Sequence, residues 1–115
     1  NIVLDRQGGP NWFENWCVAP IIVDPDIDEV YLTPIYYTMA HFSKFIRPGA
    51  KVIHVDKSDE SLMIVAAQNP DNSIAVVVFN EGNTLKHFSL SLQNRTVDLV
   101  INEQAIQTIL INTKS

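Results

Sequence analysis

Aromatic and amide side chains gather in one short stretch near the start of the chain. Trp12 and Trp16 lie close to Asn11 and Asn15, and Phe13 lies between them. A sugar presents both apolar C–H faces and hydroxyl groups, so flat rings beside amide hydrogen-bonding groups suit a carbohydrate. The alternative is that the aromatic rings pack beneath their own loop. For Trp12 both interpretations stay open, and for Asn15 we favour a binding site.

The same stretch holds the one glutamate that we consider for acid–base chemistry, Glu14. Glycoside hydrolysis normally needs two carboxylates that face one bond. Asp5 is the available partner for Glu14, but nothing in the sequence fixes the separation of the two groups. Loop carboxylates are more often solvated than catalytic, and we favour that interpretation here.

Three acids alternate at Asp24, Asp26 and Asp28, as at the opening of a calcium-binding loop. The pattern then fails, because Glu29 occupies the position at which such a loop requires glycine. A solvated acidic turn is the better interpretation. The three histidines are widely separated and lack metal-ligand spacing. We predict no metal and no other cofactor.

Composition narrows the class of protein. The chain has 115 residues, a net charge of −5, 46% hydrophobic residues and 18% charged residues. This composition argues against intrinsic disorder. The Lys and Arg residues are scattered along the chain, so the sequence shows no basic patch for binding nucleic acid. No apolar run approaches the roughly 20 residues of a membrane-spanning helix, and a single cysteine excludes an internal disulfide framework. The first residue is Asn rather than Met, which we interpret as a processed or excised chain.

The first part of the chain predicts a strand over residues 1–5, a loop over 6–20 and a brief strand over 21–23. A loop of that length is usually functional or disordered, and its aromatic residues argue against disorder. Thr33 and Pro34 predict the start of a helix that ends at Pro48. His41 lies beside the apolar face of this helix and is expected to be structural. Four apolar residues share that face: Ile35, Met39, Phe42 and Ile46.

The rest of the chain predicts short strands separated by turn signals. We place the strands at 51–56, 61–68, 73–79, 84–92, 97–101 and 105–111, and the segment 75–79, apolar on both faces, should be central. Short strands at this spacing indicate an antiparallel β-sandwich. The fold class is therefore mainly β with one helix. We divide the chain into 1–49, which looks like the last strand–loop–helix unit of a larger (β/α) domain, and 50–115, the sandwich.

Several blocks of the sequence resemble glycoside hydrolase family 30, in its glucosylceramidase (acid β-glucosidase) branch. The resemblance covers nearly the whole chain. It rests on Asn-Ile-Val-Leu-Asp at 1–5, Gly-Gly-Pro-Asn-Trp at 8–12, Pro-Ile-Ile-Val-Asp at 20–24, His-Phe-Ser-Lys-Phe-Ile at 41–46 and Ala-Val-Val-Val at 75–78.

This resemblance implies a retaining β-glycosidase built from a (β/α)₈ TIM barrel and an attached β-sandwich. The chain resembles its C-terminal end, the eighth barrel strand with its loop and helix and then most of the sandwich. Active sites of such barrels lie in the loops after the strands. The substrate-pocket residues that the resemblance implies are Asn1, Asp5, Asn11, Trp12, Asn15 and Trp16.

The resemblance places both catalytic glutamates upstream of Asn1, and Glu14 matches neither. The 115 residues alone are therefore expected to be inactive. The expected partners are a β-glucoside or glucosylceramide-like substrate and the remainder of the barrel. A secreted or lysosome-like compartment is favoured by the resemblance, although the source could be bacterial. The alternatives are a noncatalytic carbohydrate-binding sandwich, with Trp12 and Trp16 as its platform, and a structural interaction domain.

Overall fold

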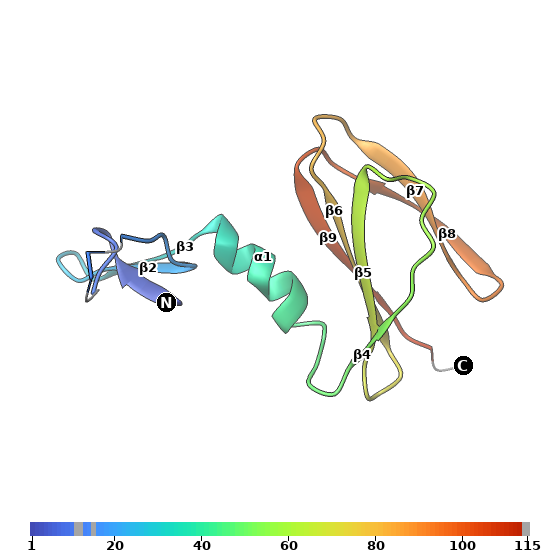
Figure 1. Ribbon diagram of the computed structural model, residues 1–115, viewed down its shortest axis with the longest axis horizontal. Helices are drawn as coiled ribbons and strands as arrows, with labels where there is room; N and C mark the ends of the chain where they lie inside the picture. The colour runs from blue at the N-terminus through green and yellow to red at the C-terminus, as the bar shows by residue number, and fades with distance from the viewer. Residues whose placement is uncertain (11–12, 15, 114–115) are drawn as a thin grey trace. The chain divides into compact units, whose positions relative to one another are not determined.

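The computed structural model describes residues 1–10, 13–14 and 16–113. Their contacts divide the chain into two compact units, Asn1–Ala40 and His41–Ser115, and each unit is described by itself. Figure 1 shows the order of the elements along the chain.

The first unit contains a three-stranded sheet in the order β1-β2-β3. The strands are β1 (Val3–Asp5), β2 (Ile21–Asp24) and β3 (Glu29–Leu32). β1 runs parallel to β2, with Val3 opposite Ile21, whereas β2 and β3 are antiparallel. The sequence did not predict β3, because we took its first residue, Glu29, as part of the acidic turn. The alternation of Glu29 and Tyr31 with Val30 and Leu32 suits a strand with two different faces.

Helix α1 (Pro34–Ser43) begins where the sequence predicts but ends earlier. One more turn follows it, in which the Ile46 amide donates to the Phe42 carbonyl, before Gly49 adopts a φ of 87°. None of the helix residues is buried, and the predicted apolar face is exposed at Ile35 and Met39.

The second unit is a β-sandwich. One layer is a four-stranded antiparallel sheet in the order β4-β5-β6-β9, and the other is the β7–β8 hairpin. The bounds are β4 (Lys51–Ile53), β5 (Leu62–Gln68), β6 (Ile74–Asn80), β7 (Lys86–Leu92), β8 (Arg95–Ile101) and β9 (Ala105–Ile111). As predicted, β6 is central, with β5 and β9 on its two sides.

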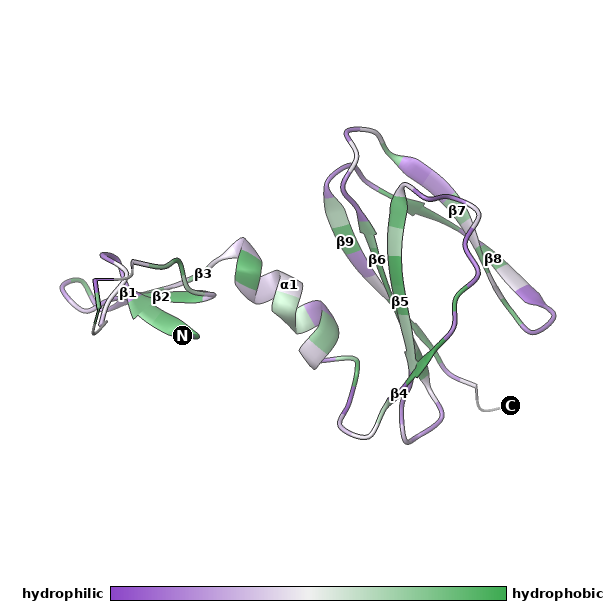
Figure 2. Cartoon of the chain, viewed as in Figure 1, coloured by the Kyte–Doolittle hydropathy of each residue, from purple (hydrophilic) through white to green (hydrophobic). Residues whose placement is uncertain are grey.

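The core of the sandwich lies between these layers. Val76 and Val78 from β6 and Leu62 from β5 pack in one buried cluster with Ile101 from β8. Figure 2 shows the apolar character of β5 and β6. β7 alternates between two faces, because Phe88, Leu90 and Leu92 pack against the core while the serines between them are exposed.

The end of α1 is fastened to the sandwich within this second unit. His41 Nδ1 lies 2.8 Å from the Thr108 hydroxyl on β9. The Asn69 side chain accepts from the Arg47 amide at 2.9 Å and donates to the Phe45 carbonyl at 2.8 Å. These bonds explain why the compact unit begins at His41, inside the helix, rather than after it.

Candidate functional site

The loop after β1, residues 6–20, carries most of the predicted pocket residues, and its first turn is built around Asp5. Asp5 Oδ1 accepts hydrogen bonds from the amides of Gln7 at 2.9 Å and Gly9 at 2.8 Å. The Asp5 amide donates to the Gly9 carbonyl at 2.7 Å, and the Gly8 amide donates to the Asp5 carbonyl at 3.1 Å. In this structure Asp5 therefore shapes the loop.

Two glycines stand at close approaches in this turn. Gly8 has a φ of 84°, and a Cβ there would lie 3.0 Å from the Cys17 carbonyl oxygen. A Cβ on Gly9 would lie 3.1 Å from Asp5 Oδ2. Only glycine adopts the Gly8 backbone conformation readily, and a side chain there would meet the backbone of Cys17. Gly8 thus lets the first turn of the loop approach the backbone at Cys17.

An ion pair ties the same turn to the end of β2. Arg6 Nη1 lies 2.9 Å from Asp24 Oδ2, and the side chain of Asp24 is 4% exposed, whereas that of Arg6 is 63% exposed. The hydrogen bond to the Asp24 carboxylate, with its charge, raises the pKa of Arg6 above its ordinary value. The prediction of a solvated acidic turn is wrong for Asp24, because β2 carries its side chain inward. Asp26 and Asp28 are exposed as expected.

The far end of the loop is held by Thr33. Its hydroxyl donates to the carbonyls of Ala19 at 3.2 Å and Pro20 at 2.9 Å, and its amide donates to the Pro20 carbonyl at 2.9 Å. Thr33 directly precedes α1, as the sequence predicts, and its carbonyl accepts from the Tyr36 and Tyr37 amides, while its hydroxyl also holds the carbonyls that lead into β2. Ala19 is fully buried at this point.

The middle of the loop presents apolar side chains to the surface. Phe13 is 91% exposed and Trp16 is 63% exposed. Glu14, between them in sequence, is exposed at a φ of 53°, and Asp5 Oδ1 already binds two amides. The structure thus gives no sign of a catalytic pair made from Asp5 and Glu14.

The structure describes three of the six predicted pocket residues: Asn1, Asp5 and Trp16. Asp5 and Trp16 both lie against the turn at Gly8 and Gly9. Asp5 Oδ1 accepts from the Gly9 amide, and Trp16 Cε3 lies 3.5 Å from the position of a Cβ on Gly8. Asn1 is exposed before β1 begins. Three more of the predicted residues lie outside the described part of the chain: Asn11, Trp12 and Asn15. The sequence did not single out Arg6, for which no motif exists.

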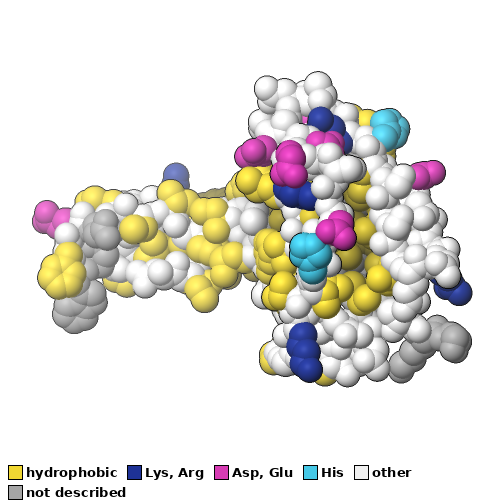
Figure 3. All heavy atoms as spheres, turned by 45° about the vertical axis from the view of Figure 1, so that its right-hand side comes forward, with side chains coloured by type: hydrophobic (Ala, Val, Ile, Leu, Met, Phe, Trp, Pro, Cys, Tyr) yellow, Lys and Arg dark blue, Asp and Glu magenta, His cyan; other side chains and the backbone are white. Residues whose placement is uncertain are grey.

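The sandwich has a cleft of about 710 Å³ between its layers. Its floor is apolar, with Ile64 on one side and Phe88 and Leu90 on the other, and polar side chains such as His54, Asp59 and Ser89 also line it. Figure 3 shows hydrophobic side chains in a hollow of this unit, bordered by charged and histidine side chains.

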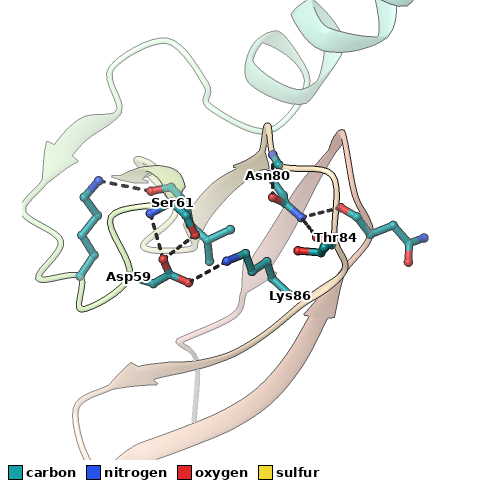
Figure 4. Close-up of polar contacts among 9 residues, drawn as sticks. Asp59, Ser61, Asn80, Thr84 and Lys86 are labelled. Carbon is teal, nitrogen blue, oxygen red and sulfur yellow. Dashed lines mark hydrogen bonds and ion pairs between the residues drawn. The ribbon is translucent and has the colours of Figure 1, made fainter.

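Polar contacts line the rim of this cleft (Figure 4). Asp59 accepts from the Ser61 hydroxyl at 2.5 Å and from the Ser61 amide at 2.9 Å, and Lys86 Nζ lies 4.0 Å away. The hydrogen bonds from Ser61 lower the pKa of Asp59 below its ordinary value. These contacts stabilise the segment before β5 and show no arrangement for catalysis.

The buried Asn80, also drawn in Figure 4, joins two turns of the sandwich. Its Nδ2 donates to the carbonyls of Thr84 at 2.9 Å and Asn102 at 3.0 Å, and its Oδ1 accepts from the Gly82 amide at 3.0 Å. This side chain is structural.

Neither a metal site nor a membrane-spanning helix emerges from the described residues. No group of three or more His, Cys, Asp or Glu side chains is placed to hold a metal ion there. In the same part of the chain, no helix has the length and apolar character needed to cross a membrane.

Comparison with known proteins gives two relatives of interest. The lysosomal acid glucosylceramidase of Mus musculus is 42% identical over 84 residues, which cover 72% of this chain and 16% of that protein. The glucuronoxylanase XynC of Bacillus subtilis is 42% identical over 64 residues, which cover 56% of this chain and 15% of that protein. The chain thus spans less than a fifth of the length of either relative.

A solved structure extends the likeness to the fold. SrfJ from Salmonella typhimurium superposes with a TM-score of 0.95 at 29% identity, over 99% of this chain and 26% of that one. Together with this match, the strand and helix order confirms the predicted fold class, mainly β with one helix: a TIM-barrel fragment followed by a β-sandwich.

Both halves of the chain match one family. Residues 1–46 match the glycosyl hydrolase family 30 TIM-barrel domain, and residues 49–109 match the glycosyl hydrolase family 30 beta sandwich domain. The chain therefore belongs to glycosyl hydrolase family 30.

Proposed function

We propose that this chain is the C-terminal part of a retaining β-glycosidase that hydrolyses β-glucosidic bonds of glycolipids or related β-glycosides. In this proposal residues 1–49 form the last strand–loop–helix unit of the catalytic barrel, and residues 50–115 form the sandwich. The catalytic glutamates come from the preceding barrel. The observation that carries the proposal is the family match together with 42% identity to a glucosylceramidase.

The role proposed for this segment is to form one wall of the substrate pocket. In TIM-barrel enzymes the loops that follow the strands hold the active site. The loop 6–20 follows β1, and hydrogen bonds hold both of its ends, at Asp5 and at Thr33. We propose Asn1, Asn11, Trp12, Asn15 and Trp16 as residues that face the sugar, with Asp5 as the residue that shapes their loop.

A second substrate class is favoured by a specific observation, the 42% identity to a glucuronoxylanase. An enzyme of that kind would cleave a xylan backbone rather than a glucoside. Both candidates share the same double displacement through two carboxylates, so they differ in substrate and not in chemistry.

The experiment that tests the proposal uses the full-length protein that contains this chain. It should release the aryl group from an aryl β-glucoside and glucose from glucosylceramide in detergent, with little action on glucuronoxylan. Cleavage of glucuronoxylan alone would favour the second candidate. Activity on none of the three substrates, by a folded protein, would refute the glycosidase proposal and favour a noncatalytic carbohydrate-binding or structural role.

A further inference from the structure

Arg6 stands at the entrance of the loop 6–20 and makes its one described ion pair with a residue 18 positions away. Its guanidinium lies 2.9 Å from Asp24 Oδ2, at the end of β2. The contact joins the segment just after β1 to the end of the neighbouring parallel strand. The ion pair therefore connects the first residue of the loop to the strand that follows the loop.

The environment of Asp24 makes this pair more than a surface contact. Exposed ion pairs contribute little because water competes for both charges. Here the carboxylate side chain is only 4% exposed. Its Oδ1 accepts from the Asp26 amide at 3.2 Å, and its Oδ2 faces Arg6. No other Lys or Arg among the described residues forms an ion pair with it. Loss of Arg6 would thus leave a buried carboxylate without its cation, which is costly.

We propose that the Arg6–Asp24 ion pair positions the pocket loop, and that Arg6 is a positioning residue for the glycosidase activity. This inference rests on the proposed function. The Asp5 turn lies directly beside Arg6, so the pair fixes that turn against β2. At the other end of the loop, Thr33 makes the corresponding attachment. Attachment at both ends is expected to order the loop before substrate binds.

The first experiment measures hydrogen exchange in the full-length protein. The variants are Arg6→Gln, Arg6→Lys and the double variant Arg6→Gln with Asp24→Asn, and the matched control is Arg95→Gln, which removes an exposed cation from the sandwich. Arg6→Gln should speed exchange of the peptide 6–20 and leave the peptide 73–92 unchanged. The double variant should exchange more slowly than Arg6→Gln, because Asn keeps the acceptor for the Asp26 amide but carries no charge.

The second experiment measures kinetics on an aryl β-glucoside well below the unfolding temperature. Arg6→Gln should lower kcat/KM about tenfold, which corresponds to about 1.4 kcal/mol. Arg6→Lys should recover part of the loss, because an ammonium group can still reach one oxygen of Asp24. The Arg95→Gln control should match the wild type.

Several results would overturn the inference. Unchanged exchange of the peptide 6–20 in Arg6→Gln would do so, because Arg6 would then have no effect on the loop. Faster exchange spread evenly over both peptides would also do so, because the effect of Arg6 would then not be specific to the loop. Wild-type kinetics in Arg6→Gln with a loosened loop would also do so. If Arg6→Gln fails to fold, Asp24→Asn alone should still loosen the loop, and no loosening refutes the pair. If the wild-type protein has no glycosidase activity, the proposed function fails, and the exchange data still decide whether the pair positions the loop.

Discussion

Asn69 offers a sharp test of how the helix end is attached to the sandwich. The residue is 5% exposed, and its side chain makes three hydrogen bonds, with the Arg47 amide, the Phe45 carbonyl and the Ser73 hydroxyl. Asn69→Ala removes all three. A net contribution of about 1 kcal/mol for each bond gives an expected loss of about 3 kcal/mol in the free energy of unfolding.

The assay is equilibrium urea unfolding of the full-length protein, followed by circular dichroism. The matched control is Asn83→Ala, because Asn83 is exposed and accepts one long bond, at 3.2 Å, from Gln104. The control should lie within about 0.5 kcal/mol of the wild type, as surface substitutions usually do. If Asn69→Ala unfolds at the same urea concentration as Asn83→Ala, with the same dependence on urea, the attachment does not stabilise the protein as argued.

Four further expectations follow from the structure and the proposed function. The isolated 115-residue chain should not hydrolyse an aryl β-glucoside, and turnover that survives repurification and disappears on Glu14→Gln would contradict the proposal. The isolated chain should also bind an apolar dye and aggregate, since its cleft and helix face are open; a sharp, monomeric unfolding transition would count against this. In the full-length enzyme Asn15→Ala should lower kcat/KM by up to about tenfold while the exposed Asp26→Ala is nearly silent, provided that both variants keep wild-type thermal stability. Because the folded-state pKa of Asp59 is lowered, its contribution to stability is present above about pH 4 and is lost as the pH falls further, so thermal unfolding of wild type and Asp59→Asn should converge in acid.

Much of the sandwich could be predicted from the sequence, because local signals and the global fold agree there. The continuous apolar run of β6 predicts a central strand, and the alternation in β7 predicts one wet face, as the structure confirms. The turn Asn69 to Asn72 is also where the sequence places it, with Asn72 at a φ of 69°. Each of these elements depends on neighbours that are near in sequence or on a simple two-residue period.

The loop region could be predicted less well, because its geometry depends on contacts between distant residues. Nothing in the sequence pairs Arg6 with Asp24, and the acidic composition around Asp24 suggests solvent rather than burial. The hydroxyl contacts of Thr33 could not be predicted for the same reason, since the carbonyls it binds come from a segment 13 and 14 residues earlier. Long-range pairing of this kind leaves no periodic signal.

The pairing of β6 with β9 has a consequence for the synthesis of the protein. Ile74 lies opposite Ile111, and Asn80 lies opposite Ala105. The partner of β6, strand β9, therefore leaves the ribosome only after the whole β7–β8 hairpin. Until then the most apolar strand of the sheet has one open edge, and such an edge invites pairing with other chains. A premature stop codon before position 105 would remove β9 and leave this edge of β6 permanently open. We therefore expect truncated products to accumulate as insoluble protein, rather than as a folded but weakened enzyme, when their solubility is compared with that of the full-length protein in cell lysates.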